Sequence, residues 1–382
     1  MMYKIGEVFT LIRNGANIKQ GEDDTGYPIT RIETISNRVV DRNKMGYAGI
    51  HEIGRYSDYI LEDGDILMSH INSETHLGKV ALYEEIPGET IIHGMNLLCL
   101  RPNRSILNCR YAFYSLMSDG FLRQIPRIMK KSVNQASFTV TALKELQIHV
   151  PPMEQQLQVV SVMDRIQSLL LQRQKQAAVI DQLVKSRFIE LFGEPLSNQK
   201  GWQTMSIVEA APIKSQRGDL ADEVWLLNLD AVEAQTGTVL FKHRVQSGEI
   251  NASTVYFTAE SVLYSKLRPY LNKVVMPDED GVATSEMIPM YPLADRLNRA
   301  YLCYWLRSDA FVRHISEKVA GAKMPRVSMD YFRSLAIEMP PLELQEQFAT
   351  FVEQTDKSKL AVQKGLQELE ILKKSLMQQY FG

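Results

Sequence analysis

The sequence has little that would suggest a disulfide-bonded, exported or membrane-bound protein. Its three cysteines, Cys99, Cys109 and Cys303, are too few and too scattered for a disulfide framework, and no Cys and His pairing has zinc-site spacing. No basic segment followed by an apolar stretch opens the sequence, and no later apolar run approaches the roughly 20 residues of a membrane helix. We therefore expect a cytoplasmic protein without a membrane partner.

The common catalytic and metal-binding motifs are missing as well. There is no Gly-x-x-x-x-Gly-Lys-Ser/Thr loop and no Gly-x-Gly-x-x-Gly after a strand, His51-Glu52 lacks a second histidine four residues on, and the seven histidines are dispersed. An Asp/Glu-x-Lys nuclease triplet and an Asn/Asp-Pro-Pro-Tyr segment for amino-methylation of a base are also absent. A Ser/His/Asp or Cys/His set stays open, because its members meet only in the fold.

The charge balance neither supports nor excludes nucleic-acid binding. The chain has 43 basic and 45 acidic residues, a net charge of −2, and is 45% hydrophobic and 23% charged. Attraction to phosphate depends on the face that is presented rather than on the total charge. The length of 382 residues favours two or three domains of ordinary size.

An internal repeat organises the chain. The segment Pro151-Pro152-Met153-Glu154-Gln155-Gln156 returns 189 residues later as Pro340-Pro341-Leu342-Glu343-Leu344-Gln345. The same offset, without a gap, carries five further residues onto identical ones: Leu183, Lys185, Ser186, Phe192 and Gly193 onto Leu372, Lys374, Ser375, Phe381 and Gly382. The chain is therefore one unit present twice, each a globular part followed by a long segment.

Each long segment, 151–193 and 340–382, is predicted to be a helix, with prolines at its start and a glycine at its end. Apolar residues recur with 4-3 spacing, which is typical of a coiled-coil seam. They are Val159, Met163, Ile166, Leu170, Ala177, Ile180, Val184 and Leu191 in the first copy, and Phe348, Val352, Val362, Leu366, Leu369, Leu376 and Tyr380 in the second, where Thr355, Lys359 and Lys373 share the stripe. We expect the two helices to pack antiparallel on each other; that each instead covers its own domain remains the alternative.

The globular parts, 1–150 and 194–339, are predicted to be mixed α/β (α+β) domains with short strands. In the first copy the expected strands are 27–32, 65–69, 79–83 and 96–100, and in the second they are 225–229, 261–264, 273–276 and 287–291. A helix expected at 110–118 is matched by another at 299–308.

These features resemble the specificity (S, HsdS) subunit of type I restriction-modification systems. The resemblance rests on two variable α/β domains, each followed by Pro-Pro-x-Glu-x-Gln and a long helix ending in Lys-Ser-x(5)-Phe-Gly. Lys266–Lys273 and the Thr284-Ser285-Glu286 turn are also similar to common features of target recognition domains. The first copy departs there, with His70-Ile71-Asn72-Ser73 and His93-Gly94-Met95-Asn96.

The resemblance implies a non-catalytic adaptor with two target recognition domains separated by an antiparallel two-helix coiled coil. Its partners would be double-stranded DNA, two methyltransferase (M) subunits and, in some complexes, restriction (R) subunits. S-adenosylmethionine would bind the M subunits, ATP and Mg the R subunits, and no cofactor this chain. Each domain would read half of an asymmetric bipartite site, and the helices would set the gap between the halves.

The candidate DNA contacts are basic side chains with aromatic or amide neighbours, because lysine and arginine bind phosphates while arginine, asparagine and glutamine can also read base edges. The first group is Lys266, Arg268, Tyr270 and Lys273. The second is Lys323 and Arg326, with Lys130, Lys131, Asn134 and Gln135 at the corresponding place in the first copy. His70 and Asn72 are added by position only.

Two other functions remain open from the sequence alone. One is a duplicated enzyme whose active site is built from residues that form no known motif. The other is a coiled-coil scaffold that reads no DNA sequence. The helices are also expected to be the docking surface for the M subunits, since exposed Leu, Phe and Tyr are costly without a partner.

Overall fold

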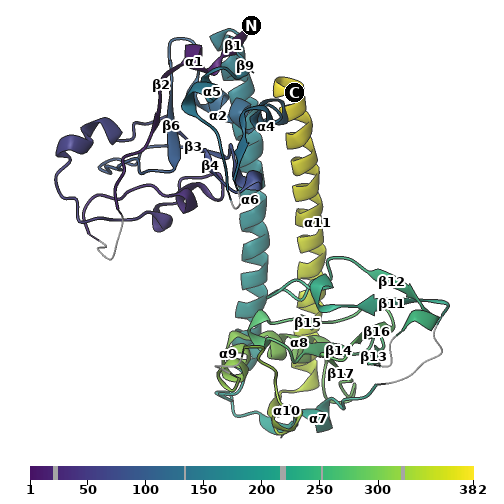
Figure 1. Cartoon of the computed structure of the whole chain (residues 1–382). Helices are drawn as coiled ribbons and strands as arrows, with labels where there is room; N and C mark the ends of the chain where they lie inside the picture. The colour runs from purple at the N-terminus through teal and green to yellow at the C-terminus, as the bar shows by residue number, and fades with distance from the viewer. Residues whose placement is uncertain (20–24, 133–134, 216–220, 251–252, 320–322) are drawn as a thin grey trace. The chain divides into compact units, whose positions relative to one another are not determined.

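The computed structural model describes residues 1–19, 25–132, 135–215, 221–250, 253–319 and 323–382. The chain forms two compact units (Figure 1): unit 1 comprises Met1–Gln172 and Gly365–Gly382, and unit 2 comprises Arg173–Lys364. Both units combine helices and strands, so the predicted mixed fold class is confirmed. Within the described ranges no helix combines the length and the apolar character that crossing a membrane requires.

Unit 1 is built on a four-stranded antiparallel sheet in the order β2-β6-β3-β5. A three-stranded sheet, β4-β8-β7, and the pair β1-β9 flank it. The strands are β1 (Met2–Lys4), β2 (Phe9–Asn14), β3 (Ile66–Ser69), β4 (Ile71–Asn72), β5 (Val80–Leu82), β6 (Leu97–Pro102), β7 (Lys130–Lys131), β8 (Ala136–Ser137) and β9 (Gln147–His149). The helices are α1 (Ile5–Val8), η1 (Ile32–Ile35), η2 (Arg42–Lys44), η3 (Gly54–Tyr59), η4 (Glu74–His76), α2 (Cys109–Met117), α3 (Asp119–Leu122), α4 (Ile125–Ile128) and α5 (Val140–Lys144).

Unit 2 repeats this plan with a different division of its strands. Its sheets have the orders β12-β11-β16-β13, β15-β14-β17 and β10-β18, and among the strand pairs of its described residues only β11-β16 is parallel. The strands are β10 (Gln203–Ser206), β11 (Glu223–Leu227), β12 (His243–Gln246), β13 (Thr254–Phe257), β14 (Val262–Ser265), β15 (Val274–Val275), β16 (Gly281–Thr284), β17 (Met287–Met290) and β18 (Ala336–Met339). The helices are α7 (Ile207–Ala210), η5 (Leu229–Ala231), η6 (Ser247–Glu249), η7 (Pro269–Leu271), α8 (Arg299–Arg307), α9 (Asp309–Glu317) and α10 (Met329–Arg333).

Most of the predicted elements are present, with ends shifted by a few residues. The helices expected at 110–118 and 299–308 are α2 and α8, and seven of the eight expected strands coincide with β3, β5, β6, β11, β14, β15 and β17. The strand expected at 27–32 is wrong. Only Ile29 in it pairs, through single bridges to Gly46 and Ile92, and η1 begins at Ile32. The segment is an irregular loop in which Ile29 and Thr30 are buried, rather than a strand in a ladder.

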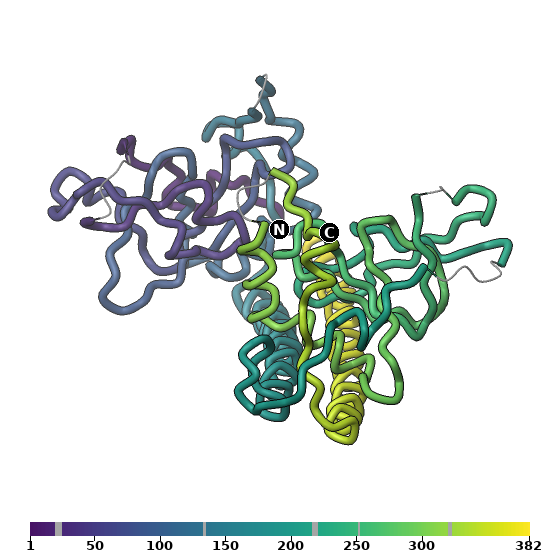
Figure 2. Tube along the Cα trace, turned by 90° about the horizontal axis from the view of Figure 1, so that it is seen from below, coloured from purple at the N-terminus to yellow at the C-terminus, as the bar shows by residue number. Residues whose placement is uncertain are grey.

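The two long helices, α6 (Met153–Phe192) and α11 (Leu342–Phe381), lie side by side within each unit (Figures 1 and 2). In unit 1 the Lys373 ammonium donates to Gln167 Oε1 at 2.7 Å, and in unit 2 the Lys359 ammonium donates to Asp181 at 2.6 Å. Residue numbers rise on one helix as they fall on the other, so the packing is antiparallel, as predicted. The polar residues Lys359 and Lys373 on the predicted stripe therefore have partners on the opposite helix.

Each long helix also contributes to both globular cores. Phe192, near the end of α6, packs on Tyr301 in unit 2, with ring centroids 4.7 Å apart. Phe381, near the end of α11, packs on Tyr111 in unit 1 at 5.1 Å. The aromatic residue of the repeated Lys-Ser-x(5)-Phe-Gly pattern thus closes the core next to which its helix ends. The alternative in which each helix only covers its own domain is not what the structure has.

The Pro-Pro-x-Glu-x-Gln motif places a buried glutamine that joins the helix start to the globular core. The side-chain oxygen of Gln156 accepts a hydrogen bond from Asn108 N at 2.8 Å, and that of Gln345 accepts one from Asn298 N at 2.7 Å. Each amide nitrogen donates to two backbone carbonyls: those of Ile106 and Pro151 in unit 1, and those of Arg296 and Pro340 in unit 2. Because Asn108 and Asn298 cap α2 and α8, the motif fixes two helices at once.

Candidate nucleic-acid interface

One loop in each unit carries half of the predicted DNA contacts, four in unit 2 and two in unit 1. We call residues 70–79 of unit 1 and 266–273 of unit 2 the reading loops; they connect β3 to β5 and β14 to β15. Two backbone hydrogen bonds show that the loops are equivalent. They run from Ser69 N to Lys79 O (2.9 Å) and from Phe138 N to His70 O (3.2 Å) in unit 1, and from Ser265 N to Lys273 O (3.0 Å) and from Val327 N to Lys266 O (2.9 Å) in unit 2.

In unit 1 a small sheet gathers the predicted contacts from two parts of the sequence. Strand β8 pairs with β4 on one side and β7 on the other, so Asn72 and Lys131 both lie opposite Ala136. Lys130, Lys131 and Gln135 are exposed, and Lys131 forms an ion pair with Glu74 at 2.9 Å. Asn134 lies outside the described residues.

His70, the first residue of the unit 1 reading loop, is buried rather than presented on the surface. Its side chain is 4% exposed and its ring meets Phe138 edge-on. Burial lowers the pKa of His70 to about 4, because the cation would lose its hydration, although a backbone contact to Asn96 opposes the shift. His70 is therefore neutral at pH 7, and a DNA contact by it stays a prediction.

In unit 2 the reading loop lies against the segment that holds the second predicted group. Leu267 forms an antiparallel bridge with Arg326, and Arg268 N donates to Pro325 O at 2.8 Å. Lys266 and Arg268 therefore flank the position opposite Arg326. Arg268 and Lys323 are exposed. The two distant stretches of sequence that carry four of the predicted cations thus lie against each other here.

An acidic residue lies among these cations. Arg326 forms an ion pair with Glu286 Oε1 at 2.7 Å, and the Glu286 side chain is 19% exposed. Its other oxygen is buried and has no hydrogen-bond partner in the described part of the chain. The carboxylate holds the guanidinium in place and leaves an acceptor beside it.

The remaining predicted residues of this loop have partners inside unit 2. The Lys273 ammonium donates to Leu229 O at 2.5 Å. Burial lowers the pKa of Lys273, and the nearby Asp230 charge partly offsets this. Tyr270 exposes its ring, while its carbonyl accepts a hydrogen bond from Gln235 at 2.9 Å.

Sequence reasoning missed two residues of the unit 1 reading loop, His76 and Lys79. They line a cavity of about 220 Å³. A signal was available, because Leu77-Gly78-Lys79-Val80 matches Leu271-Asn272-Lys273-Val274. Both residues before the lysine have positive φ, 75° at Gly78 and 50° at Asn272. The match lies at an offset of 194 instead of 189, which a search at constant offset passes over.

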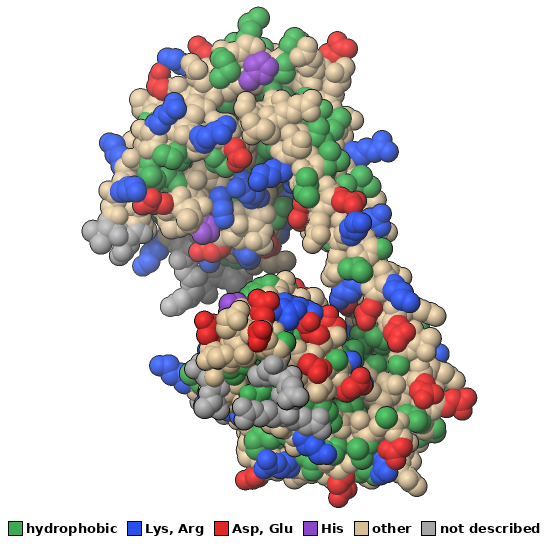
Figure 3. Space-filling view, turned by 90° about the vertical axis from the view of Figure 1, so that its right-hand side faces the viewer, with side chains coloured by type: hydrophobic (Ala, Val, Ile, Leu, Met, Phe, Trp, Pro, Cys, Tyr) green, Lys and Arg blue, Asp and Glu red, His purple; other side chains and the backbone are tan. Residues whose placement is uncertain are grey.

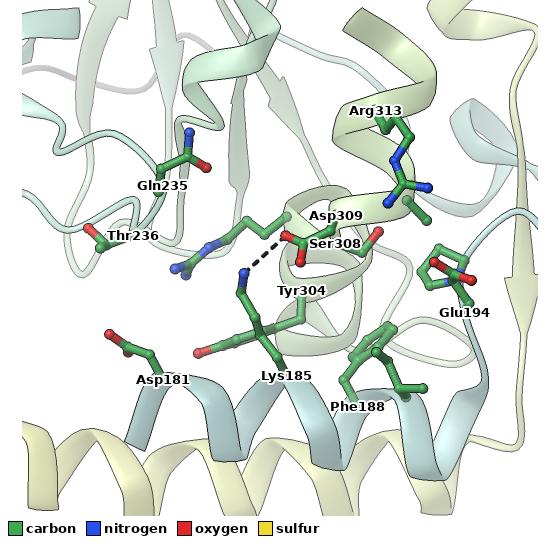
Figure 4. Close-up of a pocket in the computed structure, with 14 residues that line it drawn as sticks. Asp181, Lys185, Phe188, Glu194, Gln235, Thr236, Tyr304, Ser308, Asp309 and Arg313 are labelled. Carbon is green, nitrogen blue, oxygen red and sulfur yellow. Dashed lines mark hydrogen bonds and ion pairs between the residues drawn. The ribbon is translucent and has the colours of Figure 1, made fainter. Parts of the chain in front are cut away.

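A second cavity, of about 320 Å³, lies in unit 2 where α6 meets α8 and α9. In Figure 4 the Lys185 side chain extends from α6 toward Asp309, and the ion pair between them measures 3.0 Å. Tyr304 and Phe188 form an aromatic part of the lining. The lysine of the repeated Lys-Ser-x(5)-Phe-Gly pattern thus joins α6 to the first turn of α9.

The surface charge is mixed rather than uniformly basic. On the face drawn in Figure 3, basic and acidic side chains are interspersed over both units, in keeping with the net charge of −2. The described ranges contain no group of three His, Cys, Asp or Glu side chains that could hold a metal ion. The chemistry that the structure does gather is a set of hydrogen-bond donors and cations on two equivalent loops.

Comparison with known proteins finds relatives that match most of the chain. The family model of the type I restriction modification DNA specificity domain matches residues 1–180 and 199–371. The putative type I restriction enzyme MjaX specificity subunit of Methanocaldococcus jannaschii is 30% identical over 390 residues, which cover 98% of this chain and 91% of that protein. The EcoDI specificity subunit of Escherichia coli is 25% identical over 40% of this chain and 34% of its own length.

Solved structures share the fold at low sequence identity. The S subunit of a type I restriction-modification system from M. genitalium has a TM-score of 0.59 and 14% identity, with 99% of this chain and 94% of that chain covered. A chain from a study of complex assembly and conformational transition of the type I R-M system has a TM-score of 0.57 and 16% identity, with 100% and 97% covered. These two likenesses concern the fold alone.

Proposed function

The chain belongs to the type I restriction-modification DNA specificity family, and from this premise we propose that each unit reads one half of an asymmetric bipartite DNA site. Members of the family are specificity subunits, adaptors without catalysis of their own. The observation that carries the proposal is the equivalence of the two reading loops. Each joins corresponding strands, and each lies beside a second basic segment from the end of its globular part.

The different side chains on the two loops suit two different half-sites. Lys266 and Arg268 in unit 2 correspond to His70 and Asn72 in unit 1. An arginine can bind guanine bidentately, whereas an asparagine can pair with adenine. Equivalent frameworks with different readers should recognise different base sequences, which makes the whole site asymmetric.

The long helices would set the distance between the half-sites. Each is a 40-residue helix, which rises about 60 Å at 1.5 Å per residue. Two readers on one duplex can engage together only at spacings that their linker allows. We expect changes in helix length to alter the gap between half-sites and to leave both half-sites unchanged.

The same helices would dock the methyltransferase subunits. Leu183 and Leu372 occupy equivalent positions in the repeat, and their side chains are 50% and 47% exposed. Leu171 and Leu360 form a second such pair, also exposed. Exposed leucines that recur at equivalent positions of two paired helices are more typical of an interface than of a free surface. A surface present twice fits two copies of an M subunit.

The cofactors would belong to the partners. S-adenosylmethionine would bind the M subunits, and ATP with Mg would bind an R subunit where one is present. This chain would supply DNA recognition and positioning, in a cytoplasmic complex.

Co-expression with the cognate methyltransferase, followed by mapping of methylated adenines, tests the proposal. We expect a bipartite motif, and exchange of residues 1–150 for those of another family member should change one half of it only. Replacing Lys266 and Arg268 with alanine should weaken DNA binding; unchanged affinity and methylation pattern would favour a scaffold that reads no sequence. Methyl transfer by the purified chain alone would overturn the adaptor assignment.

A further inference from the structure

The cavity beside the unit 1 reading loop is lined mainly by polar side chains. Its volume is about 220 Å³, well above the roughly 10–15 Å³ that one water molecule requires. Ile32 and Ile35 of η1 provide the apolar wall. The polar lining comes from η1 and the residue after it, from the last residue of β3 and from the reading loop: Glu33, Ser36, Ser69, Asn72, Ser73, His76 and Lys79.

Comparison of the two units shows what is unusual about Lys79. Its counterpart Lys273 lies beside η5 and donates its ammonium hydrogen to Leu229 O at 2.5 Å. Lys79 lies beside η1, yet its ammonium has no hydrogen-bond or ion-pair partner among the residues that the structure describes. Lys79 is half-buried and lines the cavity. A partly desolvated ammonium without a partner favours an anion in the space it faces.

His76 presents a second donor to the same cavity. Its Nδ1 lies 2.9 Å from Ser73 Oγ and 3.0 Å from Thr75 Oγ1. When Nδ1 accepts a hydrogen bond from one of these hydroxyls, the ring carries a proton on Nε2. Nε2–H then remains free to donate, and nothing in the described ranges accepts from it.

Several other polar groups at the cavity form hydrogen bonds with their neighbours. Asn72 donates to Ser69 Oγ at 3.2 Å and accepts from Ser73 N at 2.8 Å. Lys44 donates to Ser36 Oγ at 3.1 Å, which adds a cation at the rim, where Asp41 lies 3.8 Å from it. Glu33 is the one anionic side chain in the lining, and it is exposed. The site lies on the loop that carries the predicted DNA contacts His70 and Asn72.

We propose that this cavity is a phosphate site of unit 1, in which Lys79 and His76 Nε2–H hold one backbone phosphate of the DNA. The inference rests on the proposed DNA-reading function and adds a contact that unit 2 does not duplicate, because Lys273 is held by a carbonyl. A phosphate contact positions the unit on the duplex and carries no sequence information. The site would thus set the register in which the neighbouring side chains meet the bases.

The test measures DNA affinity of the complete complex of this chain with its methyltransferase subunits, at several salt concentrations. Lys79→Gln should weaken binding about tenfold, the worth of one charge-assisted hydrogen bond, equally for cognate and non-cognate duplexes. The slope of log K against log salt should become shallower by about 0.9. The methylated motif should stay the same. Lys144→Gln, which removes an exposed charge of α5 outside the cavity, is the matched control and should change neither quantity.

A second variant, which is expected to bind DNA more tightly, keeps the proposal testable even if the Lys79→Gln protein misfolds. Glu33→Gln removes the anion from the lining and should strengthen binding several-fold at low salt, with a smaller effect at high salt. An unchanged slope in Lys79→Gln together with unchanged affinity in Glu33→Gln would overturn the phosphate site. A changed methylation motif in Lys79→Gln would also overturn it, because the residue would then read a base. If the wild-type complex shows no sequence-specific methylation, the proposed function itself fails, and this inference with it.

Discussion

Replacing Gln345 with leucine should destabilise unit 2 strongly although no charge and little volume change. The side chain is 0% exposed, and it makes three hydrogen bonds to backbone groups of Asn298, Arg296 and Pro340 at 2.7, 3.1 and 2.8 Å. Leucine would leave one N–H and two carbonyls without this partner, in surroundings that are buried or partly buried. Each such group costs about 1–3 kcal/mol, so we expect a loss of about 3 kcal/mol or more in the free energy of unfolding.

Urea denaturation followed by tryptophan fluorescence would measure this loss, since all three tryptophans, Trp202, Trp225 and Trp305, lie in unit 2. A loss of 3 kcal/mol should lower the melting temperature by about 6–12 °C for a unit of this size. Gln347→Leu is the control, because Gln347 is exposed two residues away and should change stability by about 0.5 kcal/mol at most. Equal stability of the Gln345→Leu and Gln347→Leu proteins would refute the role of the buried amide.

Three further predictions concern the cores and the helix pair. Phe192→Ala should lower the free energy of unfolding by about 3–5 kcal/mol, because the ring is buried against Tyr301. Thermal unfolding measures this loss, and a loss near zero would show that the ring adds nothing to that core. Burial lowers the pKa of His93 to about 4, so on acidification the unfolded chain takes up a proton at this histidine before the folded chain does. Unit 1 should keep its full stability above pH 6.5 and lose up to about 3 kcal/mol of unfolding free energy as the pH falls to 4. The difference in unfolding free energy between pH 7 and pH 4 should be smaller in His93→Gln, and an identical difference would contradict the assignment. Lys359→Gln should cost about 1 kcal/mol or less, because Asp181 is half exposed; a larger loss in urea denaturation would mean that the pair is better shielded than its exposure suggests.

The parts of the fold that follow local rules could be predicted from the sequence. The 4-3 spacing of apolar residues and the flanking prolines and glycines predict α6 and α11 because a helix brings residues three and four apart onto one face. Strands such as β3 and β14 follow from short apolar runs between turns. The segment 27–32 shows the limit of that rule, since a strand-like run can also lie in an irregular loop that makes only single bridges.

The candidate site could be predicted only in part, and for a different reason. Basic residues between turns pointed to Lys266, Arg268 and Arg326, which the structure brings together. The same reasoning selected Lys273 and passed over Lys79, although the two lysines occupy equivalent positions. Which ammonium is bound by a carbonyl and which faces a cavity depends on residues more than 40 positions away in the sequence.

The sequence alone determined the duplication, the long helices and the absence of catalytic motifs, because periodicity, offset and composition can be seen without knowledge of the fold. Only the tertiary structure decided that each helix end completes the core it reaches, that the motif glutamines join a helix start to a cap, and that the reading loops lie against distant basic segments. Such contacts join positions far apart in the chain, and a hydrogen bond or a packed ring exists only where folding has brought both partners within reach.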